Sequence, residues 1–402
     1  MSTATLSRGT PSSQGLTPQT RPHLHFLDGI RGIAAFLVVV THMWGHCFLR
    51  TGETAYPLWF RALSVFKYGH YLVAVFIVLS GFCLMLPAVM AGGVMKNGVV
   101  SYIKRRARRI LPPYYAALAI AAGLMALFPM LRIDDGTIFS PYHRSDMAGS
   151  LVTHLLLIHN WIPHWTHRFD GPMWSVATEW QIYFVFPLML LPLWRKWGAI
   201  APIALGLALG FCTVGTILED ACFWYIGLFA MGMAACSYCF PGKTDTEVSR
   251  FWTWPRLWGV FAVVAVVMLG VARKSHHLML PCTDVIAGVL AAYLLIYCTQ
   301  KASAGESPLV LRFFSSRPVT MLGMFSYSLY LLHLPLLYIG KTLLMPHQYS
   351  APINFLIYAV VGTPLILGIT YAFHRIFERP FMNAPNPKAA TAPTAAKALN
   401  NA

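Results

Sequence analysis

Long apolar segments recur along the chain, separated by short polar and basic stretches. A helix that crosses the hydrocarbon core of a bilayer needs about 20 largely apolar residues. Ten segments meet this requirement: 26–48, 71–91, 110–130, 172–193, 199–217, 222–240, 256–272, 281–299, 319–339 and 353–376. The pattern therefore predicts an all-α polytopic membrane protein with about ten transmembrane helices, whose membrane domain covers residues 23–381.

The segments outside this pattern have different compositions. The stretch 148–162 is too short for an eleventh span and is interpreted as interfacial or re-entrant. Residues 1–22 are polar and rich in Ser, Thr and Pro, without the features of a cleavable signal peptide. The tail 382–402 is rich in Ala, Pro and Asn. Both ends are expected to be disordered.

Composition supports a membrane protein. Hydrophobic residues make up 57% of the 402 positions and charged residues only 11%, against about 25% charged residues in soluble domains. The formal net charge of +16 does not indicate nucleic-acid binding, because the basic residues are confined to short loops between apolar segments. The spacings of Cys236 and Cys239 and of the histidines in 143–167 match no closed metal motif, so we expect no metal.

The distribution of basic residues predicts the orientation in the membrane. Ten spans place both termini on one side, and the loops on that side hold more than twice as many Lys and Arg residues as the loops on the other. Cytoplasmic loops carry the excess of basic residues. Both termini are therefore predicted to be cytoplasmic, as in a multi-pass protein of a bacterial cytoplasmic membrane.

Ionisable residues within predicted spans are costly and usually functional, and four of them stand out. They are Arg31, His42, Glu179 and His333. Arg31 and His42 are eleven residues apart, which places them on nearly the same helix face about 16 Å apart along the axis. Asp28 precedes Arg31 by three residues and can pair with it.

His42, Glu179 and His333 are predicted to lie at similar depths in the outer half of the membrane, so we expect them to converge. A purely structural role as an interhelical hydrogen bonder is the alternative for His333. The basic run at 104–109 has two interpretations. It can set the orientation of the adjacent span, and it can also hold phosphate, because arginine forks suit phosphate oxygens and the start of the third span would add a positive helix dipole.

Six motifs together resemble the membrane acyltransferase-3 family, the O-acyltransferases of bacterial surface glycans and some small molecules. The motifs occur in family order across nearly the whole chain: FLDGIRGIAAFLVVVTH (26–42), VAVFIVLSGFCL (73–84), YIKRRARRILPPYY (102–115), GPMWSVATEWQIYFVFP (171–187), SYSLYLLHLPLL (326–337) and FERPF (377–381). The resemblance implies an enzyme that moves an acyl group from cytoplasmic acetyl-CoA, or another acyl-CoA, to a hydroxyl at the outer face. The acceptor would be a glycan, a lipid-linked sugar or a small molecule.

The resemblance also implies roles for particular residues. Arg31 and His42 match the family's first-span pair, Glu179 matches the Glu after W-S, and Arg106 and Arg109 match the R-x-x-R proposed to serve CoA. Chemistry adds that a neutral His42 can act as general base, oriented by Glu179 or His333. An acyl-histidine intermediate is a second route.

Other functions are compatible with part of the pattern. Ser175 could be a nucleophile, but the sequence specifies no base beside it. A proton-coupled transporter, or a flippase of a sugar- or lipid-linked substrate, would also need Arg, His and Glu inside the bundle. The acceptor, the acyl chain length, the route of transfer and the oligomeric state stay open at this point.

Cysteine labelling tests the orientation. A cysteine introduced at Asn97 should react only with reagents that reach the cytoplasm, and one at Thr137 with impermeant reagents outside, because these loops are predicted to lie on opposite sides. The reverse labelling pattern in intact cells would overturn both the orientation and a cytoplasmic acyl donor.

Overall fold

The computed structural model describes residues 24–48, 57–128, 147–241 and 253–382, and the regular structure in these ranges is entirely helical. The longer helices are α1 (His25–Phe48), α3 (Tyr71–Val89), α4 (Gly98–Leu127), α5 (Met147–Leu156), α6 (Met173–Val185), α8 (Ile200–Phe211), α9 (Tyr225–Cys239), α11 (Trp254–Ala272), α12 (His276–Ser303), α15 (Ser326–Leu344) and α17 (Thr363–Phe373). Shorter helices are α2 (Leu58–Ala62), α7 (Leu191–Trp197), α13 (Leu309–Phe314), α14 (Arg317–Met324) and α16 (Ala351–Ile357). The all-α class is confirmed. Segment 1–22 and residues 383–402 of the predicted tail lie outside the described ranges.

Eight helices in the described part of the chain are long and apolar enough to cross a membrane, or nine if α14 and α15, bent by 72°, form one broken span. They correspond to nine of the ten predicted segments. The tenth, 199–217, forms only the 12-residue α8, which ends at Phe211. The chain then turns over residues 212–215, with Gly215 at a φ of +75°. The count of ten is thus too high for the described residues, and the side on which each terminus lies stays a prediction. Segment 148–162 contains the 10-residue α5, shorter than a span, as expected.

The third predicted span begins earlier than the sequence suggested. We expected it to start near residue 110, but α4 begins at Gly98 and carries Pro112 and Pro113 in its interior. The basic run 104–109 is therefore helical, in keeping with the high helix propensity of Lys, Arg and Ala. The expected contribution of a helix N-terminus to this run is wrong, because its arginines lie more than one turn inside the helix.

Close backbone contacts hold the central helices together. A Cβ atom at Gly81 of α3 would collide with the carbonyl oxygen of Phe229 in α9, and one at Gly232 of α9 with the carbonyl oxygen of Val78. Small residues at membrane helix interfaces permit such close approach. Cys236 is also buried in α9, consistent with a packing role. The α3–α9 pair thus forms a tightly packed centre.

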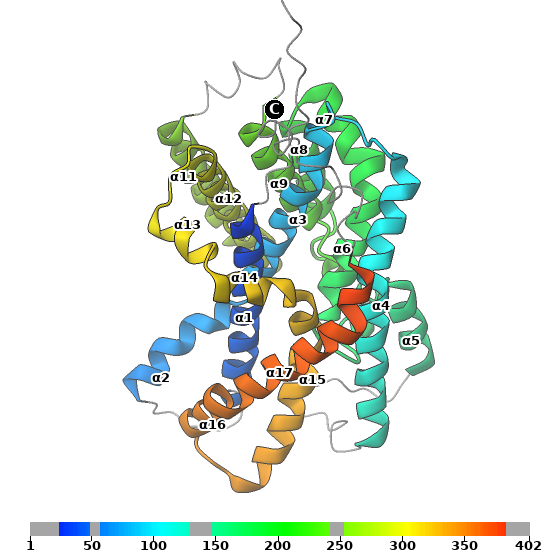
Figure 1. Ribbon diagram of the computed structural model, residues 1–402, viewed down its shortest axis with the longest axis vertical. Coiled ribbons are helices and arrows are strands. Elements are labelled where there is room, and N and C mark those ends of the chain that lie inside the picture. Colours follow the sequence, from blue (N-terminus) through cyan, green and yellow to red (C-terminus); the bar gives the residue numbers. More distant parts are fainter. Residues whose placement is uncertain (1–23, 49–56, 129–146, 242–252, 383–402) are drawn as a thin grey trace, which may run out of the picture.

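The other helices are arranged around this centre and α1. In Figure 1, α4, α5 and α6 stand on one side of α1, and α11 and α12 stand on the other. Only 6% of the apolar stretch of α11 is buried, as expected for a helix that faces lipid. Helices α1, α3, α4, α6 and α15 meet in the interior, where each lends residues to one cavity.

Substitution of the central glycines tests this packing. Gly232→Ala should destabilise the protein by about 1–3 kcal/mol, because the added methyl overpacks a contact with backbone that cannot move alone. Gly259→Ala in α11 is the matched control, since a Cβ atom there meets nothing within 4 Å, and alanine favours the helix. Thermal unfolding in detergent measures both. Equal melting temperatures for the two variants would contradict the packing.

Candidate active site

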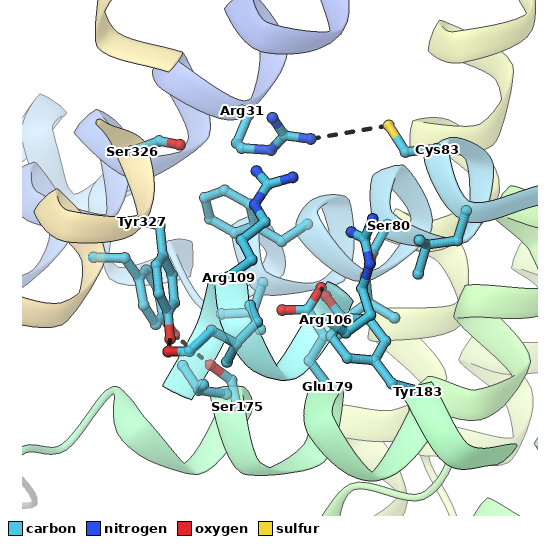
Figure 2. Close-up of a pocket in the computed structure, with 17 residues that line it drawn as sticks. Arg31, Ser80, Cys83, Arg106, Arg109, Ser175, Glu179, Tyr183, Ser326 and Tyr327 are labelled. Atoms are coloured by element: carbon cyan, nitrogen blue, oxygen red, sulfur yellow. Dashed lines mark hydrogen bonds between the residues drawn. The ribbon is translucent and has the colours of Figure 1, made fainter. Parts of the chain in front are cut away.

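One cavity brings together four of the predicted site residues. Arg31 of α1, Arg106 and Arg109 of α4, and Glu179 of α6 all line a cavity of about 110 Å³ (Figure 2). The rest of its polar lining consists of Ser80 and Cys83 of α3, Ser175 and Tyr183 of α6, and Ser326, Tyr327 and Tyr330 of α15. The sequence identified the four ionisable residues separately, and the fold places them around one space.

Helical geometry accounts for each orientation. Arg106 and Arg109 are three residues apart, so they share the inner face of α4, whereas Lys104 and Arg108 are exposed. The predicted pair within α1 is present, since Arg31 Nη1 lies 3.1 Å from Asp28 Oδ1. Glu179 Oε1 accepts a hydrogen bond of 2.7 Å from the Tyr183 hydroxyl.

The cavity carries an excess of positive charge. Three guanidinium groups and one carboxylate line it. Among the described residues, neither Arg106 nor Arg109 has a carboxylate within ion-pair distance, and the buried Arg106 Nε has no hydrogen-bond partner. A buried charged donor without a partner is costly. The cavity therefore has the properties of an anion-binding site.

The two predicted catalytic histidines form a pair outside this cavity. His333 Nε2 lies 3.2 Å from His42 Nδ1, with the ring centroids 4.9 Å apart. His333 Nδ1 donates to the carbonyl of Tyr330 at 2.8 Å, and His42 Nδ1 lies 2.9 Å from the carbonyl of Val38. A carbonyl can only accept, so both neutral rings carry their proton on Nδ1. This leaves the lone pair of each ring on Nε2.

Tyr330 and Ser175 separate the cavity from the histidine pair. The Tyr330 hydroxyl and Ser175 Oγ form a hydrogen bond of 2.7 Å, and both residues line the cavity. On its other side the Tyr330 ring lies 5.8 Å from the His333 ring, measured between centroids. A histidine base for Ser175 is not present in the described helices, since its hydroxyl is bonded to Tyr330 and to the carbonyl of Pro172.

The expected convergence of His42, Glu179 and His333 is only partly present. His333 does contact His42, so the partner that could orient His42 is His333. The hydrogen bond of Glu179 goes to Tyr183 instead, and Glu179 shares the cavity with the arginines. Residues at a similar depth in the membrane can still lie apart in the plane of the membrane, which explains the difference.

A buried carboxylate in α12 was not among the residues predicted from the sequence. Asp284 is fully buried and accepts a hydrogen bond of 2.9 Å from Trp224 Nε1, while its Oδ2 lies 3.2 Å from His70 Nε2. The signal was present, because Asp284 falls inside the predicted span 281–299 and an ionisable residue there is a functional candidate.

A second missed carboxylate is Glu378, within the motif 377–381. It accepts hydrogen bonds from Ser328 Oγ at 2.5 Å and from His374 Nδ1 at 2.9 Å, and all three residues are buried. Ser328 belongs to α15 and the other two follow α17. These bonds therefore fix the end of the last long helix against α15.

The histidines in 143–167 do not form a metal site in the part of the chain that the structure describes. His154 and His159 stack with ring centroids 3.8 Å apart, and burial lowers the pKa of His154 to about 4. Burial also raises the pKa of the Asp170 carboxyl well above its usual range. Across the described ranges no three His, Cys, Asp or Glu side chains have a metal-binding arrangement; His143 lies outside those ranges.

Comparisons with known proteins point to one family. A family model described as "Acyltransferase domain" matches residues 24–375. Acyltransferase MdmB of Streptomyces mycarofaciens is 28% identical over 185 residues, which is 44% of this chain and 43% of that protein. The putative membrane-bound transacylase BcsY of Komagataeibacter xylinus is 24% identical over 348 residues, 81% of this chain and 76% of that protein.

A third relative covers most of the chain. Peptidoglycan O-acetyltransferase OatA of Listeria monocytogenes is 22% identical over 392 residues, which is 89% of this chain but 56% of that protein. The matches thus span about half the length of the first and third relatives and three quarters of the second. No solved structure is a significant match.

Proposed function

The chain belongs to the acyltransferase-3 family, and from that premise we propose that it is a membrane O-acyltransferase that moves an acyl group from cytoplasmic acyl-CoA to a hydroxyl at the outer face. The family match over residues 24–375 confirms the resemblance drawn from the six motifs, and an acyltransferase is the class of enzyme that the resemblance implied. The donor, the acceptor and the residue roles below are parts of the proposal.

The arginine-lined cavity is the observation that carries the proposal. CoA is a polyanion, and arginine binds phosphate oxygens through two parallel hydrogen bonds. In this proposal Arg106 and Arg109 hold the phosphates, and the partnerless Arg106 Nε gains an acceptor. Arg31 lines the same cavity, and the acyl-bearing arm of CoA would run past it toward α15.

The histidine pair supplies the chemistry. His42 carries its lone pair on Nε2, so this nitrogen can take the proton of an acceptor hydroxyl or attack the thioester. His333 Nε2 faces the Nδ1–H of His42 at 3.2 Å and stabilises the charge that develops on the His42 ring. Rotation of Tyr330, which breaks its bond to Ser175, would join the donor cavity to this pair.

The relatives guide the choice of substrates. One of them is named as a peptidoglycan O-acetyltransferase, which supports acetyl as the transferred group and a glycan or related molecule as the acceptor. The first test is therefore acetyl transfer. Inverted membrane vesicles containing the protein should release CoA thiol from [¹⁴C]acetyl-CoA and place the label in an ester. Vesicles that import or export substrate without thiol release would support a transporter instead.

His42→Ala should lower acetyl transfer by about a hundredfold or more, because a general base usually contributes at least that factor to the rate. The amount of protein in the membrane and its thermal unfolding should stay near those of the wild type, because the close contacts that pack α1 against α14, such as Gly32 on Gly323, do not involve the imidazole. Transfer is measured as ester label per mole of protein. A well-expressed variant that retains most of the transfer would remove His42 from the mechanism.

The arginine cradle, formed by Arg106 and Arg109, is tested by a double variant with a matched control. Arg106→Gln with Arg109→Gln should raise the KM for acetyl-CoA by on the order of ten- to a hundredfold for each guanidinium–phosphate hydrogen bond that the substitutions remove. Lys104→Gln with Arg108→Gln removes the same charge from the exposed face of the same helix and should leave KM nearly unchanged.

Each double variant keeps four of the six basic residues between Lys96 and Arg109. Cysteine labelling at Asn97 should therefore report an unchanged orientation. Equal KM values for the two double variants would mean that the arginines only set the topology. A fall in the affinity for the acceptor alone would place them at the wrong substrate.

A further inference from the structure

The Asp284–His70 pair is a second buried acid–base group that the proposed function does not use. Asp284 lies inside α12 with a fully buried side chain, and its Oδ1 has no hydrogen-bond partner in the described part of the chain. A carboxylate in this position is expensive and usually serves a functional partner. Trp224 Nε1 and His70 Nε2 both point at its Oδ2.

The pairing determines which nitrogen of His70 is basic. A carboxylate only accepts hydrogen bonds, so His70 Nε2 carries the proton and shares it between Asp284 Oδ2 at 3.2 Å and the Tyr225 hydroxyl oxygen at 3.1 Å. The lone pair of the neutral ring is then on Nδ1. His70 is 29% exposed while Asp284 is 0% exposed, so the carboxylate is hidden and the basic ring remains accessible. Histidine held in this way by a buried carboxylate is suited to take up a proton.

His70 and the histidine pair belong to one neighbourhood. The His70 ring stacks on Trp174, with centroids 5.7 Å apart and an interplanar angle of 8°. Trp174 precedes Ser175, whose hydroxyl bonds Tyr330, and the Tyr330 ring packs against His333.

The neighbourhood closes on its other side through α1. His333 contacts His42, and His42 follows Thr41. A Cβ atom at Gly69, the residue before His70, would collide with Thr41 Oγ1, so the segments that precede the two histidines touch. A closed circuit of contacts from α1, α3, α6 and α15 thus contains two separate histidine bases, each held by its own partner.

Direct transfer from donor to acceptor needs one base, which His42 could supply. In transfer through an acyl-histidine, Nε2 of His42 is blocked by the acyl group, so another group must take the proton of the acceptor hydroxyl. We propose that His70, positioned by Asp284, is the base of a second chemical step in which the acceptor hydroxyl takes the acyl group from His42. This inference rests on the proposed function and selects the two-step route for it.

In the first step His42 Nε2 forms a bond to the thioester carbonyl carbon and the C–S bond breaks. The CoA thiolate leaves and takes a proton from solvent, while the Nδ1 proton of His42 passes to His333 Nε2. The acyl group is then carried by a neutral acyl-imidazole. The 3.2 Å separation of the two nitrogens fits this proton transfer.

In the second step the acceptor hydroxyl gives its proton to His70 Nδ1 as its oxygen bonds to the acyl carbon. The C–N bond breaks and its electron pair returns to His42, which recovers the Nδ1 proton from His333. His70 then releases its proton to solvent. The net reaction exchanges the thioester for an oxygen ester.

The test uses a nucleophile that needs no base. Hydroxylamine attacks an acyl-imidazole as the free amine, so it should bypass His70 but not His42. Purified protein with acetyl-CoA alone should release about one equivalent of CoA thiol in a burst, as expected for an acyl-enzyme intermediate. In inverted vesicles, acetyl should pass both to the endogenous acceptor as ester and to added hydroxylamine as hydroxamate.

His70→Ala and Asp284→Asn should each keep the burst and the transfer to hydroxylamine, and lose about a hundredfold or more of the ester formation. Asp284→Asn, as a change to a positioning residue, should also shift the pH dependence of ester formation but not that of the burst. His277→Ala is the matched control. His277 pairs with Glu219 at 2.9 Å outside this circuit, and all three readouts should match the wild type.

Unchanged ester formation in His70→Ala would overturn the inference, and so would loss of the burst together with ester formation, because the pair would then be structural. Wild-type turnover without a burst would overturn the two-step route while leaving the proposed function intact. Absence of CoA release from the wild type under every condition would overturn the proposed function itself.

Discussion

A charged or polar side chain inside a bilayer must find a partner or a water-filled space, and this constraint shapes the interior of the molecule. Several ionisable groups in the described helices are either paired or line the cavity. Asp28 pairs with Arg31, and Glu378 accepts hydrogen bonds from Ser328 and His374. The guanidinium groups of Arg106 and Arg109 gather where a ligand can reach them. The cost of burying charge thus concentrates the chemistry at the meeting point of α1, α3, α4, α6 and α15.

Close packing makes that meeting point possible. Glycines in α3 and α9 let the two backbones touch, and Gly323 of α14 packs in the same way on the carbonyl of Asp28. The 72° bend between α14 and α15 then directs α15 past α1, so that His333 reaches His42. Overpacking at any of these contacts would shift side chains of the candidate site as well as lower stability.

The candidate site has two parts with different chemistry. The cavity offers guanidinium groups and suits a polyanion, whereas the His42–His333 pair lies against the Tyr330 ring outside it. A hydrogen bond between Tyr330 and Ser175 stands between them. Under the proposed function, this division would separate the binding of a charged donor from the reaction of its acyl group.

Features that lie within one helix could be predicted from the sequence alone. The apolar pattern predicted nine spans that the structure describes, the three-residue spacing predicted the Asp28–Arg31 pair, and the costliness of intramembrane charge selected Arg31, His42, Glu179 and His333. These properties follow from hydropathy and from 3.6 residues per turn. Which helices meet could be seen only in the folded molecule. There His333 rather than Glu179 contacts His42, and Asp284 holds His70 although the two residues are far apart in the chain. The length of α8, too short for a span, also became clear only there. Such contacts depend on the bends and tilts of the helices and on close glycine-to-backbone contacts between them. A single sequence records the periodicity of each helix but not how the helices are arranged beside one another in the plane of the membrane.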